Sequence, residues 1–305
     1  MRLQRNIGLA CASLLLLAGC KPFEGGQTVP AYLSIDRITV ENTPGNSVSQ
    51  MQGYFSSLID CAEVIIYVNG DTSQTNLGVY ELPCCIPILR SDTIDKVIVN
   101  PVVKQNGIAA THIDYPYYSS IELDKVFVAP NDTTSLGSLT THYVAQSHCV
   151  WEEFFEPGAQ GLNIDSIVHR LLYNQAGALD TILSDNGCGV VHVSQSQEAL
   201  NFWSKDTIDM SRYGSESYLY LEMDYWTDFN LSVGFNNPTM VGGTSNIHSA
   251  IVLYPNQGWQ KIYINLGRLW SYYNHHPYIR LYFSILNSGH LSGNVYLDNM
   301  KLLVY

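Results

Sequence analysis

The sequence predicts an all-β protein built from two β-sandwich domains, and three observations support this fold class. The 305-residue chain contains 21 tyrosines, and only 14% of its residues are charged. Tyr, Thr, Val and Ile favour strands, whereas the low content of Glu, Lys and Ala offers little for long helices. Short stretches of alternating apolar and polar residues recur with turn formers between them. The length suits one large or two ordinary domains.

Residues 1–19 have the pattern of a signal peptide. Arg2 and Arg5 precede an apolar run that is too short for a stable membrane helix and ends in Leu17-Ala18-Gly19-Cys20. These four residues resemble the lipobox of bacterial lipoproteins. The resemblance implies cleavage before Cys20 and acylation of Cys20, for example with palmitate, and two or three acyl chains make a durable anchor. An ordinary secretory signal with a chance cysteine is the alternative.

The net charge of the chain limits the classes of partner that it is expected to bind. Removal of residues 1–19 takes away two arginines and no acid, so the net charge of −12 becomes −14. This acidity argues against nucleic acid and against adsorption to anionic lipid, because both require clustered Lys and Arg. No later apolar run reaches the ~20 residues that a membrane helix requires. We therefore expect contact with a membrane only through the N-terminal lipid.

The residues after Cys20 bear on localisation. Lys21 stands where well-studied lipoproteins of the bacterial inner membrane carry Asp, so the resemblance implies the cell outer membrane. The composition and the domain pairing are similar to those of Bacteroidota envelope lipoproteins. Surface-export signals of that group place several acids after the cysteine, and here only Glu24 is present. Periplasmic and surface-facing orientations both stay open.

The N-terminal half has the pattern of a small β-sandwich. Residues 20–29, with two glycines, a proline and no periodicity, are expected to form a lipidated tether. The sandwich is expected at residues 30–146 and opens with an alternating strand at 32–40. Asn69-Gly70 supplies the positive φ that a tight hairpin needs. Further strands are expected at 63–68, 77–83, 95–103 and 121–128.

The C-terminal half, residues 147–305, is expected to form a second sandwich. Its opening stretch, 149–158, resembles the first strand of a galactose-binding-like jelly roll, the fold of many carbohydrate-binding modules. About eight short strands with turns between them are what a double-sheet sandwich needs. One such fold hosts many functions, so the resemblance implies architecture more than ligand. Later stretches with this pattern are 218–226, 229–235, 258–266, 280–286 and 293–303.

An odd number of cysteines is left once Cys11 departs with the signal and Cys20 takes lipid, so at least one has no intrachain partner. An exported protein meets an oxidising compartment, which allows a disulfide, for example between Cys61 and Cys84 or Cys85. Burial as small hydrophobic side chains is the alternative. No spacing indicates a zinc site, because no Cys-x-x-Cys or tight Cys/His cluster occurs. The five are Cys61, Cys84, Cys85, Cys149 and Cys188.

An aromatic stretch at 269–278, expected to be a loop, is the main candidate for ligand binding. Flat rings stack on the apolar faces of sugars and also anchor protein interfaces, although the same rings can instead fill the core. Trp226, with Asp224 and Asp228, is a second candidate face, and strand alternation favours a core position for its rings. The candidate ligand-binding residues are Trp270, Tyr272, Tyr273, His275, His276 and Trp226.

The jelly-roll resemblance also implies a structural calcium ion between an acid of the first strand and an Asp near the last. Glu153, Glu156 and Asp298 stand at comparable places, although the residue after Asp298 is Asn rather than a second Asp. Metal binding by the adjacent His275 and His276 is less favoured, since neighbours on a strand point apart. No other cofactor is expected.

Motifs for catalysis are absent from the sequence. It contains no Gly-x-Ser-x-Gly, no His-Glu-x-x-His and no phosphate-binding glycine loop. We expect a protein that is not an enzyme, and a glycosidase pair drawn from Glu152, Glu153, Glu156 and Asp298 is the alternative. The main hypothesis is a scaffold or accessory binding subunit of an outer-membrane assembly, docking a protein partner through a tyrosine-rich surface. The alternative is a lipoprotein that binds carbohydrate through its C-terminal domain.

Overall fold

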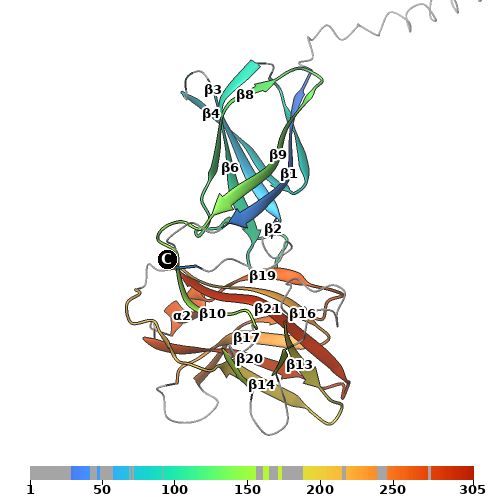
Figure 1. The fold of residues 1–305 in the computed structure, drawn as a ribbon, viewed down its shortest axis with the longest axis vertical. Coiled ribbons are helices and arrows are strands. Elements are labelled where there is room, and N and C mark those ends of the chain that lie inside the picture. Colours follow the sequence, from blue (N-terminus) through green and yellow to red (C-terminus); the bar gives the residue numbers. More distant parts are fainter. Residues whose placement is uncertain are drawn as a thin grey trace, which may run out of the picture.

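A computed structural model describes most of the chain after the tether. The residues described are 29–41, 47–48, 58–68, 70, 72–90, 92–155, 161–164, 171–173, 188–214, 218–238, 246–273 and 276–305. The signal peptide and Cys20 lie outside them. Within them the chain is all-β apart from one short helix, α2 (Gly267–Tyr272), which confirms the predicted fold class (Figure 1). No helix in these ranges is long and apolar enough to cross a membrane.

Strands β1 to β9 build an N-terminal sandwich of a four-stranded and a five-stranded sheet. In the first sheet β1 (Ala31–Glu41) pairs antiparallel with β2 and β5 and parallel with β9. The second is ordered β4-β3-β6-β7, with β8 beside β6. The other bounds are β2 (Leu58–Ile59), β3 (Cys61–Val68), β4 (Ser73–Glu81), β5 (Cys84–Ile88), β6 (Asp92–Lys104), β7 (His112–Asp114), β8 (Ile121–Val128) and β9 (Thr133–His142).

Alternation explains the strands that the sequence predicted here. Along β3 every second side chain, from Ala62 to Val68, is buried between the two sheets. The β3–β4 hairpin forms as expected, and Gly70 in its turn has a φ of +68°. Strand β9 was not predicted, because its partner β1 lies about 100 residues earlier and parallel pairing over such a distance leaves no local signal.

Strands β10 to β21 build the C-terminal sandwich from two six-stranded sheets. One is ordered β12-β13-β21-β16-β19, with β10 beside β21, and the other β11-β14-β20-β17-β18, with β15 beside β20. The bounds are β10 (His148–Glu153), β11 (Leu162–Ile164), β12 (Leu171–Tyr173), β13 (Gly189–Val193), β14 (Ala199–Ser204), β15 (Ile208–Asp209), β16 (Leu219–Thr227), β17 (Asn230–Asn236), β18 (Ile247–Leu253), β19 (Gln260–Asn265), β20 (Tyr278–Leu286) and β21 (Gly293–Val304).

The core of the C-terminal sandwich lies between these sheets. Phe202 and Phe283 stack there with ring centroids 5.0 Å apart. Gly234 stands at a bulge between β17 and β18, where a Cβ atom would lie 1.9 Å from the His248 carbonyl oxygen. Only glycine allows this close approach of two strands.

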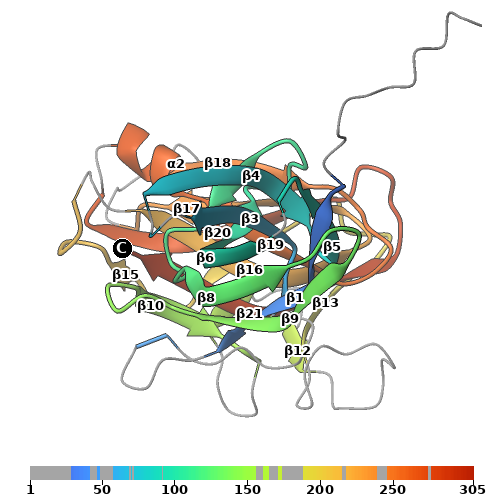
Figure 2. The ribbon, with the colours of Figure 1, turned by 90° about the horizontal axis from the view of Figure 1, so that it is seen from above.

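The N-terminal sandwich stands on the outer face of the β16-β19-β21 sheet, as Figure 2 shows from above. Tyr220, Tyr263 and Leu303 of that face belong to the same apolar cluster as the N-terminal core. This is why β16 is buried on both faces, although its sequence alternates only in part. The turn after β6 covers the edge strand β19, since the Asn106 N–H donates to the Tyr263 carbonyl at 2.8 Å.

The disulfide that the sequence allowed, between Cys61 and Cys84 or Cys85, is not formed in the structure. All five cysteines of the described chain are free thiols. Cys84 and Cys85 lie on β5 opposite β1, whereas Cys61 lies on β3 of the other sheet, opposite Glu81 and Val102. Because the two strands belong to different sheets, the pattern of alternation could not reveal this separation.

Candidate functional site

A cleft of about 570 Å³ opens between the two sandwiches. The N-terminal side contributes the end of β6, β7 and the segment after it, and the C-terminal side contributes the start of β16, the end of β19 and α2. Clefts between domains are a common place for ligand sites. The lining residues are Gln105, Ile113, Asp114, Pro116, Tyr218, Tyr220, Asn265, Gly267, Arg268 and Ser271.

Hydrogen bonds across the domain junction fix the polar groups at one end of the cleft. The Tyr220 hydroxyl donates to Gln105 Oε1 at 3.0 Å and accepts from Asn265 Nδ2 at 3.0 Å. The Asn265 backbone N–H donates to Asn106 Oδ1 at 2.8 Å. Burial raises the pKa of Tyr220 to about 12, so its hydroxyl stays protonated at neutral pH. These groups hold the cleft open in one geometry.

Other groups in the cleft are available to a ligand. Within the described chain, the side chains of Asp114, Arg268 and Ser271 make no intramolecular hydrogen bond or ion pair. The Tyr218 side chain is 50% exposed, so part of its ring is open to solvent. Burial, and then the nearby Glu63, raise the pKa of Asp114 above its ordinary value. The cleft therefore offers an aromatic ring, an acid, a guanidinium and a hydroxyl.

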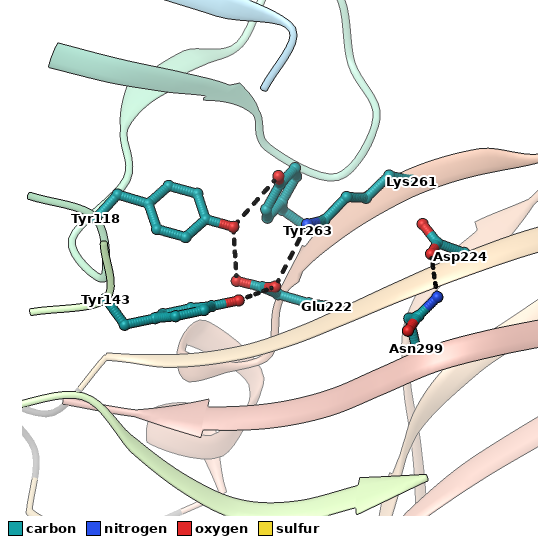
Figure 3. A network of polar contacts seen from close by, with 7 residues as sticks. All are labelled: Tyr118, Tyr143, Glu222, Asp224, Lys261, Tyr263 and Asn299. Atoms are coloured by element: carbon teal, nitrogen blue, oxygen red, sulfur yellow. Dashed lines mark hydrogen bonds and ion pairs between the residues drawn. The ribbon is translucent and has the colours of Figure 1, made fainter. Parts of the chain in front are cut away.

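A buried polar network beside the cleft joins the sandwiches (Figure 3). The Glu222 carboxylate on β16 accepts hydrogen bonds from the hydroxyls of Tyr118, at 3.3 Å, and Tyr143, at 2.9 Å, and lies 3.7 Å from Lys261 Nζ. Burial, and then the Glu222 charge, raise the pKa of both tyrosines well above the ordinary value. Because both tyrosines come from the N-terminal sandwich, the network fixes its position on the C-terminal one.

Lysines complete the charge balance of this network. Burial lowers the pKa of Lys261, and lowers that of Lys301 to about 8, while Glu222 opposes both shifts. The Lys301 ammonium also lies 5.3 Å from the centre of the Tyr143 ring. The Glu222 carboxylate is fully buried among lysines and tyrosines. It is therefore a structural element of the domain junction and not a site that a ligand reaches from solvent.

The structure contradicts the binding role predicted for Trp270. This residue is on helix α2 rather than in a loop, is only 1% exposed, and packs in the C-terminal core. Its indole N–H donates to the His276 carbonyl at 2.9 Å. The helix missed in the sequence is short and carries its one buried side chain at Trp270, so it leaves no periodic pattern.

The other residues of the aromatic stretch differ in their exposure to solvent. Tyr272 is 77% exposed, whereas Tyr273 is partly buried and stacks on His248 with ring centroids 3.5 Å apart. His276 is partly buried beside Tyr273. His275 lies outside the described residues, so the predicted roles of these side chains stay predictions.

Trp226 is partly buried on the outer face of its sheet rather than in the core between the sheets. Its ring lies 5.2 Å from that of Tyr296, which in turn lies 6.2 Å from Trp259. The acids predicted beside it are engaged elsewhere: Asp224 is buried and accepts from Asn299 Nδ2 at 3.0 Å, and Asp228 accepts from the Asn294 N–H at 2.8 Å.

The acids predicted to hold calcium are placed in different ways. Glu153 is buried on β10, and its carboxylate accepts backbone hydrogen bonds from Phe155 and Gly161. Asp298 is fully buried on β21 and accepts from the Asn299 N–H at 2.8 Å. Glu156 lies outside the described residues. The calcium site stays a prediction.

The chain was compared with family models, curated proteins and solved structures. No family model and no curated protein sequence matches the chain. Among solved structures, the active domain of tailspike protein 4 from bacteriophage CBA120 is similar over 56% of this chain and 26% of its own, with 11% identity and a TM-score of 0.37. The chain thus spans about a quarter of that protein.

Two carbohydrate-binding modules are also similar. The family 11 module from Clostridium thermocellum matches 50% of this chain and 93% of its own, with 11% identity and a TM-score of 0.34. A module of the β-sandwich superfamily matches 89% of this chain and 98% of its own, with 11% identity and a TM-score of 0.35. The β-sandwich fold of this chain is shown by its own strand pairing.

Sequence reasoning missed the cleft altogether. Its lining comes from segments around residues 105, 114, 218, 265 and 268, and these meet only because the domains stack as they do. The one local signal for the cleft was Tyr218, an aromatic residue directly before strand β16. In the structure this residue is half exposed at the domain junction. Neither Asp114 nor Arg268 belongs to any motif that could have identified it.

Proposed function

We propose that this chain binds carbohydrate in the cleft between its two sandwiches, without catalysing a reaction on it. One observation carries the proposal: the half-exposed Tyr218 ring shares the cleft with Asp114, Arg268 and Ser271, whose side chains make no hydrogen bond within the described chain. The cleft volume also falls within the roughly 300–1,000 Å³ of small-ligand sites.

The chemistry of these groups suits a sugar. A sugar ring has an apolar C–H face, which packs on an aromatic side chain, and a rim of hydroxyls that both donate and accept. At neutral pH the Asp114 carboxylate accepts hydrogen bonds, the Arg268 guanidinium donates them, and the Ser271 hydroxyl does either. The hydrogen-bonded wall of Gln105, Tyr220 and Asn265 keeps the cleft in shape before a ligand arrives.

The same proposal includes an outer-membrane lipid anchor at Cys20. Strand β1 begins at Ala31, opposite Ile88, at the end of the N-terminal sandwich that lies away from the C-terminal one (Figure 1). A lipid attached upstream of Ala31 would therefore present the cleft away from the membrane surface. Mass spectrometry of the processed protein tests the anchor, and an unmodified terminus at another residue would refute it.

A glycan array followed by calorimetry tests binding. The full chain should bind one class of glycan, and Tyr218→Ala should weaken that binding about tenfold, as loss of ~1.4 kcal/mol of ring contact requires. Tyr254→Ala is the matched control, since Tyr254 is 71% exposed and does not line the cleft. A blank array together with a co-purifying outer-membrane protein would replace this proposal with the scaffold hypothesis.

A further inference from the structure

Three side chains with metal-binding atoms meet on the outer face of the N-terminal sandwich. The ligand atoms of Cys61, Glu81 and His112 all lie within 4.8 Å of one another. Among the residues that the structure describes, this is the one group of three or more His, Cys, Asp or Glu side chains gathered so closely. The sequence analysis expected no such cluster, because the three residues are far apart in the chain.

The sheet order explains why these side chains meet. Cys61 on β3 lies directly opposite Glu81 on β4 and, on its other side, opposite Val102 on β6. Lys104 follows Val102 by two residues, so it points to the same face, and it pairs with His112 on β7. Four adjacent strands therefore carry these side chains on one face: Glu81 and Cys61 lie in one row, and Lys104 and His112 lie in the next row, two residues further along.

The donor set matches zinc. A thiolate, an imidazole and a carboxylate are its usual protein ligands, with bonds of about 2.0–2.3 Å. Cys61 is fully buried, whereas Glu81 and His112 are exposed. The thiol thus forms the floor of the site, and the two exposed side chains can rotate to close on an ion from solvent. Three protein ligands leave a fourth tetrahedral position open to water.

The charges around the cluster are compatible with a divalent cation. Lys104 Nζ lies 2.8 Å from Glu81 Oε1, and this ion pair leaves Glu81 Oε2 free of that contact. Asp60 and Glu81 both act electrostatically on Cys61 and Lys104. With Cys61 as a thiolate, three negative groups stand against the one positive charge of Lys104, so a zinc ion would neutralise the site. A hollow of about 310 Å³ lined by Asp60 and Lys104 opens beside it.

We propose that Cys61, Glu81 and His112 bind one zinc ion, with water in the fourth position. Such an ion would join β3, β4 and β7, close to the turn after β6 that covers the C-terminal sandwich. None of the three ligands lines the glycan cleft, so the two proposals are tested by different variants.

Cobalt(II), a spectroscopic substitute for zinc, tests the site in the full chain. One equivalent of cobalt should produce a near-ultraviolet thiolate-to-metal charge-transfer band, and zinc should displace it. Cys61→Ser should abolish the band. His112→Ala should weaken zinc affinity more than about tenfold, because loss of even an outer hydrogen-bond partner of a ligand costs about 10–100-fold. Cys85→Ser, which changes an exposed cysteine on β5, should leave the cobalt band and the zinc affinity unchanged.

Two results would overturn the proposal. One is the absence of a thiolate band with cobalt in the unmodified protein, and the other is a band that survives in Cys61→Ser. His112→Ala guards against a folding artefact, because His112 is exposed and its loss should leave the thermal unfolding of the metal-free protein unchanged. Zinc affinity equal to that of the unmodified protein in this variant would also refute the site.

Discussion

The Tyr143 hydroxyl of the N-terminal sandwich donates a 2.9 Å hydrogen bond to the buried Glu222 carboxylate of the C-terminal sandwich. Both residues are almost fully buried, so this bond forms only when the two domains are stacked. The contact makes domain pairing part of folding rather than a loose encounter. It also fixes the relative position of the two walls of the cleft.

Removal of this hydroxyl should destabilise the protein. Tyr143→Phe is expected to lower the free energy of unfolding by about 1.5–3 kcal/mol, the range for a hydrogen bond to a charged group. Chemical denaturation followed by fluorescence measures the change. Tyr272→Phe, at a side chain that is 77% exposed, should shift the value by less than about 0.5 kcal/mol. Equal effects in the two variants would show that the network does not hold the domains.

Packing of the C-terminal sandwich gives a second prediction. Gly234→Ala should destabilise the protein by about 1–3 kcal/mol, because the added methyl group would meet the His248 carbonyl, a backbone atom that cannot rotate away. Gly258→Ala is the matched control, since a Cβ atom there meets nothing within 4 Å. Thermal unfolding of both variants checks the difference, and a neutral Gly234→Ala would contradict the described bulge.

Thiol reactivity follows from burial. Cys85 is exposed on β5 and should react rapidly with a thiol reagent in the native protein. Cys188 is buried, and burial raises its pKa to about 12, so it should react only after unfolding. Mass spectrometry of labelled peptides checks this order. Rapid labelling of Cys188 in the native protein would contradict its burial.

The pH dependence of glycan binding should report on Asp114. Its pKa is raised above 3.8 by burial and by Glu63, so the carboxylate gains its proton at a higher pH than an ordinary aspartate. The ionised carboxylate accepts hydrogen bonds from sugar hydroxyls. Affinity should therefore be constant near neutral pH and fall as the pH is lowered through the raised pKa. The Asp114→Asn variant should bind glycan with little dependence on pH. Calorimetry at several pH values measures this, and a pH dependence that persists in the variant would contradict the role of Asp114.

The sequence predicted strands well wherever one face is buried and the other meets water. β1, β3 and β8 fit this rule, and their predicted ranges lie within or overlap the observed strands. Strand β16 was also predicted, at 218–226, but the rule fails on its burial, because its own core covers one face and the N-terminal sandwich covers the other. It fails also at α2, whose six residues are too few for a helical period to show.

Sites were harder to predict because they depend on contacts distant in sequence. Trp270 stood in an aromatic-rich stretch of the chain and proved to be core, since composition does not report which way a ring points. Asp114 and Arg268 are ordinary surface residues until the domains stack. Cys61 and His112 meet only through the order of four strands, which no spacing rule encodes.

Hydrogen–deuterium exchange of the full chain, with and without a saturating glycan from the array, tests the central claim most directly. Bound sugar should slow exchange at residues 112–116 and 265–271, the two walls of the cleft, and leave the edge strand β18 unchanged. Protection confined to another surface, such as the face bearing Trp226, or protection at neither wall, would contradict binding between the two sandwiches.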